Sequence, residues 1–313
     1  MASTHAARRW LTALFCLTFV IGFATANAKP AGTSTPISLW KVTDGPGHTM
    51  YLAGSMHALT QADMPLPSAY KSAFDASDHL VEELDFKDLN PRDVTKQALS
   101  MGLLKDSNLA SVMGKKDWAE VQKLAGKAGV KLYRYERFKP WLAAVAIGDT
   151  MLTHFGYQPQ LGLDLHFADL AHKRKMTSSG LETVTEQLSF FNDMKPAAQR
   201  RFLLQSLREA GSAKQDLARL HDAWAHGDIK QLATLQKKDF KHFPHLRNRL
   251  IKDRNERWLP HLLKCLHSKQ TCFVAVGVEH MAGPDGLIAL LKAKGAKIKQ
   301  MHDSVHTGTG HAQ

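Results

Sequence analysis

The chain has 313 residues, of which 44% are hydrophobic and 22% charged, enough for one large or two small globular domains with a sizeable core. Its formal net charge is +12, and the basic residues are spread along the chain. Because no basic motif with interleaved aromatic residues accompanies this charge, the composition argues against nucleic acid as a partner. A spread positive charge still attracts anionic polymers, such as polysaccharides, over long distances.

The first 28 residues have the pattern of a cleavable secretory signal peptide. Arg8 and Arg9 precede an apolar run over 10–23, and small residues follow up to Ala28, where an Ala-x-Ala site predicts cleavage. Cleavage after Ala26 also fits, and a retained anchor is the alternative, although the run is shorter than the ~20 residues of a membrane span. We expect a periplasmic or secreted protein with no stable membrane span after cleavage.

Two cysteines, Cys265 and Cys272, remain once the signal peptide with Cys16 is removed. In an oxidising compartment they can form a disulfide if their Cα atoms come within about 7 Å. Two unpaired thiols are an equal alternative, so the sequence leaves the pairing open.

Turn residues divide the first part of the mature chain. A Pro/Gly/Ser/Thr-rich linker over 29–38 precedes β-rich runs at 39–43 and 50–53, and the Gly-rich turn at 44–47 predicts a hairpin. A helix over 67–76 and a third strand over 79–86 follow.

The middle of the chain has mostly helical periodicity, and the end returns to strands. One break at 175–181 predicts a strand that delivers Glu182 at its carboxyl end. A continuous apolar run at 271–276 suits a central strand, and a helix over 287–294 and a strand over 296–301 follow it. The pattern predicts an α/β fold with a central mixed β-sheet flanked by helices. This domain spans 39–301, with a large helical insertion at about 90–270 and a flexible tail at 302–313.

The same short motif, Gly-x-x-His, follows two predicted strands more than two hundred residues apart. Its copies run from Gly54 to His57 and from Gly277 to His280. Glycine permits positive φ and a close approach of the backbone to a ligand. If the two strands are neighbours, both imidazoles can bind one divalent ion. A single copy is a weak signal, and one histidine beside a strand is more often structural than a ligand.

A carboxylate would complete such a site. Glu82 and Glu83 lie within the apolar strand over 79–86, where an acid needs a partner or an ion. Side chains alternate along a strand, so the two acids point to opposite faces. We favour Glu83 as the ligand.

These motifs, in this order, resemble the TraB/GumN family, which is related to the Tiki metalloproteases. The resemblance rests on residues 39–42, 51–57 and 80–85, on Gly162 to Asp164, on Gly180 to Thr183 and Glu186 to Leu188, on Arg254-Asn255, and on residues 273–291. It implies an α/β sheet fold shared with haem-binding ChaN-like and erythromycin-esterase-like proteins. It also implies His57, Glu83 and His280 as metal ligands, Glu182 as a ligand or general base, and Arg254 as a clamp on a carboxylate or oxyanion. For Glu182 and Arg254, a structural ion pair is an equal alternative.

The sequence therefore predicts an exported metal-dependent hydrolase, a peptidase, that uses a metal-activated water. Its cofactor would be a divalent metal such as Zn, Mn or Co, and its substrate a peptide or protein. The alternative is a non-catalytic periplasmic binding or assembly factor for haem, a polysaccharide or a protein partner, linked to exopolysaccharide production. Esterase chemistry through Ser55 has little support, because no Gly-x-Ser-x-Gly elbow is present.

Overall fold

The computed structural model describes residues 34–87 and 89–303. The predicted signal peptide, the first half of the linker and residues 304–313 of the tail lie outside these residues. Six strands form one sheet in the order β4-β3-β5-β2-β1-β6. Their bounds are β1 Thr35–Thr43, β2 Thr49–Ser55, β3 His79–Glu82, β4 Thr177–Gly180, β5 Cys272–Gly277 and β6 Lys297–Asp303. The predicted mixed α/β sheet is thus confirmed.

The two central strands β2 and β5 are parallel, and β5 is also parallel to β3, which is parallel to β4. β1 is antiparallel to both of its neighbours, β2 and β6. The carboxyl ends of β2, β3, β4 and β5 therefore lie along the same edge of the sheet.

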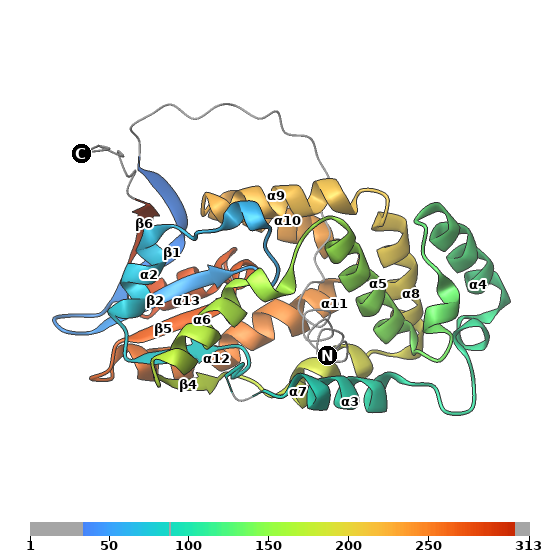
Figure 1. Cartoon of the computed structure of the whole chain (residues 1–313), viewed down its shortest axis with the longest axis horizontal. Helices are drawn as coiled ribbons and strands as arrows, with labels where there is room; N and C mark the ends of the chain where they lie inside the picture. The colour runs from blue at the N-terminus through green and yellow to red at the C-terminus, as the bar shows by residue number, and fades with distance from the viewer. Residues whose placement is uncertain (1–33, 88, 304–313) are drawn as a thin grey trace, which may run out of the picture.

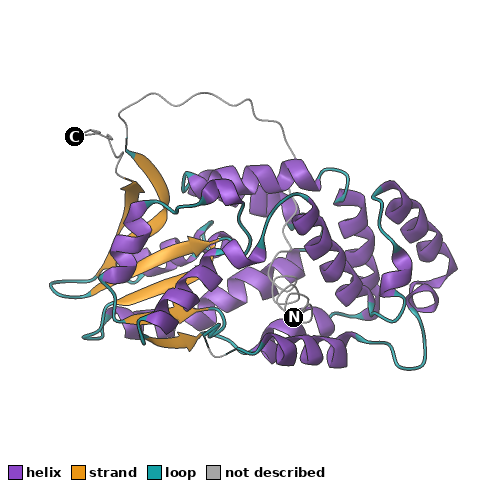
Figure 2. Cartoon of the chain, in the orientation of Figure 1, coloured by secondary structure: helices purple, strands orange, loops and turns teal. Residues whose placement is uncertain are grey.

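Helices follow the strands and fill most of the chain between β3 and β5, as Figures 1 and 2 show. Their bounds are α2 Ser68–Asp75, α3 Pro91–Gly102, α4 Leu109–Lys127, α5 Pro140–His154, α6 Leu163–Lys173, α7 Val184–Asn192, α8 Pro196–Glu209, α9 Ala213–Ala225, α10 Ile229–Asp239, α11 Pro244–Arg247, α12 Asp253–Leu266 and α13 Leu287–Ala293. A π-helical turn, η4 (Asn248–Lys252), connects α11 to α12, so residues 244–266 form three consecutive helical segments.

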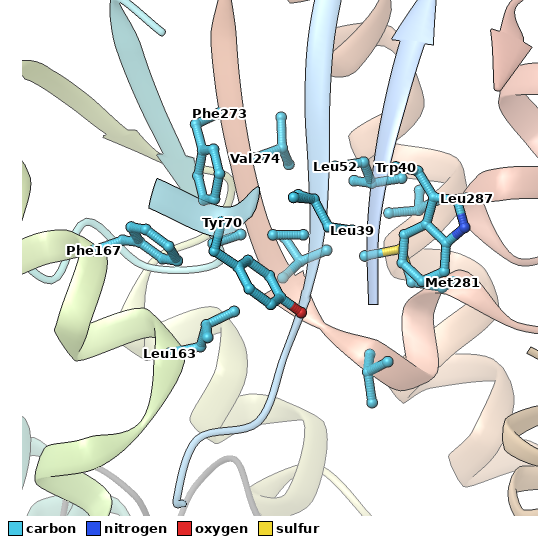
Figure 3. Packing of buried hydrophobic residues seen from close by; sticks show 14 of the residues in the cluster. Leu39, Trp40, Leu52, Tyr70, Leu163, Phe167, Phe273, Val274, Met281 and Leu287 are labelled. Carbon is cyan, nitrogen blue, oxygen red and sulfur yellow. The ribbon is translucent and has the colours of Figure 1, made fainter. Parts of the chain in front are cut away.

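Apolar side chains on both faces of the sheet build the first core. Phe273 of β5 packs on Phe74 of α2 and Phe167 of α6, and Trp40 and Leu287 belong to the same buried cluster. In Figure 3, Tyr70 and Phe167 lie on one side of the strands and Trp40 and Leu287 on the other. The sheet is therefore covered on both faces, as the continuous apolar run of β5 predicts.

A second core lies mainly among helices. It is centred on α5, where Trp141 and its neighbours are buried, and it includes side chains of α3, α4, α7 and α8. Figure 2 shows this helical part beside the half of the molecule that holds the strands. The functional side chains described below lie where the two cores meet.

Three predicted boundaries are wrong by a few residues. β1 begins at Thr35, inside the expected linker, because its first residues pair with the end of β6. For the same reason His302 belongs to β6 and not to a tail. β3 ends at Glu82, so Glu83 is the first residue after the strand and not a residue within it.

The structure joins Cys265 and Cys272 in a disulfide, with their Cα atoms 6.2 Å apart. The bond connects the last turn of α12 to the first residue of β5. It resolves the alternative that the sequence left open. Among the helices of the described residues, none combines the length and apolar character needed to cross a membrane.

Candidate functional site at the carboxyl ends of the parallel strands

The four parallel strands each deliver a polar side chain to the same edge of the sheet. His57 follows β2, Glu83 follows β3, Glu182 follows β4, and His280 lies in the 3-10 turn η5 (Val278–Met281) after β5. Ligands of open α/β sheets bind at this edge. The structure thus brings together the five residues singled out from the sequence, with Arg254 reaching them from α12.

Gly277 keeps a space open between the two histidines and Glu83. A Cβ atom added at Gly277 would lie 3.1 Å from Glu83 Oε1, 3.6 Å from His280 Cδ2 and 3.7 Å from His57 Nε2. The three side chains therefore border one small volume, although they come from three different strands.

Positive φ is not the reason for either motif glycine, contrary to one part of the expectation. Neither Gly54 nor Gly277 has positive φ. Close approach is the reason at Gly54, where an added Cβ would lie 2.7 Å from Val278 Cγ2. The first motif thus packs directly against the second, which fixes the distance between the turns that carry His57 and His280.

Each histidine is oriented by an oxygen acceptor that was not assigned a role from the sequence. His57 Nδ1 donates to Asp164 Oδ2 at 2.7 Å, and His280 Nδ1 donates to Asn255 Oδ1 at 2.6 Å. Both contacts select the tautomer whose Nε2 is the acceptor. Asp164 and Asn255 lie within segments that carry the family resemblance, and that position was the only signal for them.

Arg254 lies between the carboxylates and His280. Its Nη2 donates to Glu83 Oε2 at 2.5 Å, its Nε to both oxygens of Glu182 at 3.0 Å, and its Nη1 to His280 Nε2 at 3.1 Å. The guanidinium is largely buried, so these partners compensate a charge that is poorly hydrated.

Glu182 receives donors from four side chains. Besides Arg254, Arg257 Nη2 donates to it at 2.9 Å, Trp258 Nε1 at 3.1 Å and Gln187 Nε2 at 3.2 Å. With both oxygens occupied in this way, Glu182 anchors Arg254. The geometry favours this structural role over that of a ligand or general base.

Burial and the guanidinium set the protonation states in the site. Burial alone raises the pKa of Glu83, but Arg254 and the histidines lower it to about 2. Burial and Arg254 both lower the pKa of His280, to about 3. Burial lowers the pKa of His57, but the Asp164 carboxylate outweighs it, so the pKa of His57 is raised.

The donor chemistry fits a divalent ion, because metal ligands must be an ionised carboxylate and neutral imidazoles. Glu83 is ionised and His280 is neutral near pH 7. In both imidazoles Nδ1 donates to a side-chain oxygen, as is usual for metal-binding histidines. As the described side chains stand, no group of three His, Cys, Asp or Glu residues is arranged to hold a metal. The Arg254 guanidinium occupies the approach to Glu83 and His280.

A cavity opens directly above these side chains. Its volume is about 120 Å³, and it is lined at one end by His57, Glu83, Arg254 and His280. Its remaining walls come mostly from apolar side chains of both cores.

This protein is thus an α/β protein with a mixed sheet. A cluster of histidine, glutamate and arginine side chains lies at the carboxyl ends of its parallel strands. A model of the TraB/PrgY/gumN family matches residues 38–300, and the chain belongs to this family. An uncharacterized protein of Treponema pallidum (strain Nichols) is 21% identical over 268 residues, covering 82% of this chain and 80% of that protein. No solved structure matches the chain.

Proposed function

We propose that this protein is a metal-dependent hydrolase that cleaves peptides. The observation that carries the proposal is the meeting of His57, Glu83 and His280 around the space above Gly277. Their Nδ1 acceptors give both histidines the orientation and tautomer of metal ligands. His57, Glu83 and His280 would hold the ion.

A divalent ion at this position would polarise a scissile carbonyl and lower the pKa of water. The protein's own groups supply the rest. Arg254 already donates to two carboxylates in a buried setting, and the same fork can stabilise negative charge that develops on a substrate oxygen. Glu182 holds the fork in place.

The proposal includes export to an oxidising compartment, the periplasm or the cell exterior. The Cys265–Cys272 disulfide supports this location, because such bonds persist where thiols are not kept reduced. The predicted signal peptide at residues 1–28 lies outside the described part of the chain.

A non-catalytic binding or assembly factor is the second candidate. One observation favours this candidate: Arg254 fills the approach to Glu83 and His280. Glu182 also pairs with Arg254 and neutralises its charge. A cleft whose charges are already paired can bind a ligand without turnover.

Two histidine variants and a matched control separate the candidates. We expect His57→Ala and His280→Ala to abolish metal-dependent digestion of a peptide library in the presence of Mn²⁺ or Co²⁺. His261→Ala, an exposed change on α12, should retain full activity. The protein is purified without a His tag or chelators, and its metal content is measured by elemental analysis.

Full activity in either site variant would refute the hydrolase mechanism. Stoichiometric metal in the wild-type protein without cleavage of any peptide would instead favour the binding factor. Circular dichroism of each variant checks that the fold is retained.

A further inference from the structure

The cavity above the site has two chemically different ends. His57, Glu83, Arg254 and His280 form the polar end. The other end is lined by apolar side chains of helical segments from both cores. Met151, Phe240, Leu250 and Ile251 belong to the second core, and Phe155 and Leu217 to the first. A ligand that reaches the polar groups therefore places an adjoining group against apolar walls.

Charge and size restrict that adjoining group. Among the described residues that line the cavity, Glu279 is the one charged residue outside the polar end. Ser55 and Gln187 also line it and are neutral hydrogen-bonding groups. A sugar chain needs many hydrogen-bonding partners, which these walls do not supply. The volume of about 120 Å³ is close to that of a cavity that holds one benzene molecule, roughly 150 Å³.

Gly148 of α5 opens this apolar end. Gly148, Met151, Leu152 and Phe155 have the spacing of one helix face, and all four line the cavity. Gly148 is buried, yet an added Cβ there would meet no atom within 4 Å. Packing therefore does not require a glycine at this position. Glycine within a helix also costs about 1 kcal/mol of stability relative to alanine, so its presence here needs another reason. The space beside it is the cavity.

We propose that this cavity is a specificity pocket that accepts one large uncharged apolar side chain, such as Phe, Leu or Met, of a peptide substrate. Gly148 is the residue that makes the room. The inference rests on the proposed peptidase function, because the polar end then engages the peptide bond beside that side chain. Burial of such a side chain is worth roughly a tenfold or greater gain in affinity.

Binding is measured first, with protein that cannot cleave. Acetylated and amidated heptapeptides of Gly and Ser carry one central residue, Phe, Leu, Ala or Asn, and are titrated into the His57→Ala protein by calorimetry. We expect the Phe and Leu peptides to bind at least roughly tenfold more tightly than the Asn peptide, with a negative heat-capacity change.

Filling the pocket then tests the role of Gly148. Gly148→Leu, in the His57→Ala background and in the active protein, should remove the preference for Phe and Leu and shift library cleavage toward Ala, Ser and Gly beside the cut bond. Gly148→Ala should have a smaller effect in the same direction. Gly126→Leu is the matched control, because Gly126 is an exposed residue of α4 with equally open surroundings; it should behave as the parent protein.

The two proposals fail in different ways. Apolar preference in binding without any cleavage keeps the pocket and ends the hydrolase proposal. Cleavage with no preference beside the cut bond, or an unchanged preference in folded Gly148→Leu protein, keeps the hydrolase and overturns the pocket. Loss of folding in Gly148→Leu leaves the decision to the Gly148→Ala series and the wild-type peptide comparison.

Discussion

The pKa values of two adjacent carboxyl groups in this protein shift in opposite directions, depending on their immediate neighbours. Glu83 is buried beside Arg254 and stays ionised, with a pKa lowered to about 2. Glu82, its neighbour in the chain, is also fully buried, but no cation of the described residues lies beside it, and burial with the nearby carboxylates of Asp164 and Asp85 raises its pKa. The difference supports Glu83 as the functional acid, since Glu83 contacts Arg254 and borders both histidines.

Asp239 at the end of α10 allows a test of pH dependence. Burial, together with Glu279, Glu209 and Asp216, raises its pKa from 3.8 to about 10, and Lys238 opposes this only in part. Between these pH values the folded carboxyl keeps a proton that the unfolded chain releases, so the free energy of unfolding falls as pH rises.

We therefore expect Asp239→Asn to raise the free energy of unfolding at pH 7.5 by roughly 1 to 3 kcal/mol and to have little effect near pH 4. Denaturant unfolding at both pH values measures the change, with the exposed Asp222→Asn as the control. An equal effect at both pH values, or destabilisation at pH 7.5, would contradict the assignment.

At the scale of elements, the site depends on close contacts between turns. The turn after β2 packs against the start of α6, where an added Cβ at Gly162 would lie 2.2 Å from the carbonyl oxygen of His57. Gly162 directly precedes α6, whose Asp164 orients His57. The position of one helix therefore controls the histidine of a strand that lies over a hundred residues earlier.

Gly162→Ala should separate these two elements. Because the colliding atom belongs to the backbone, we expect a loss of roughly 1 to 3 kcal/mol in stability and a larger loss of metal-dependent cleavage than stability explains. Thermal unfolding and peptide digestion measure both. Gly211→Ala, where an added Cβ meets nothing within 4 Å, should change neither quantity. Unaltered activity in Gly162→Ala would show that this contact does not position His57.

The whole molecule consists of two cores, one around the sheet and one among helices. The cavity is lined by residues of both. The turns after the parallel strands and Arg254 of α12 supply its polar groups, and side chains of both cores supply its apolar walls. A ligand in the cavity thus contacts both parts of the structure.

Metal binding should therefore stabilise the whole fold. At about 100 times the dissociation constant, a ligand specific for the folded state adds about 2.7 kcal/mol, or several degrees in Tm. We expect Mn²⁺ or Co²⁺ to raise the Tm of a chain ending at Asp303, which lacks the His-containing tail, and a chelator to reverse it. The same shift in the His57→Ala, His280→Ala double variant would place the ion elsewhere.

The sequence by itself determined the local features of this protein. Two β-rich runs with turn residues between them predicted the β1–β2 hairpin, and the apolar run of β5 predicted a doubly covered strand, because burial and backbone geometry restrict which residues occur at neighbouring positions. The repeated Gly-x-x-His motif and the family resemblance selected His57, Glu83, His280, Glu182 and Arg254.

Only the tertiary structure decided how these residues act on one another. The orientation of His57 by Asp164, the occupation of Glu182 by four donors, the pairing of Cys265 with Cys272 and the open space beside Gly148 all depend on elements that meet through folding. Sequence periodicity does not predict such contacts, because it reflects only the secondary structure of each segment by itself. Distances between segments far apart in the chain are fixed by the packing of the whole molecule.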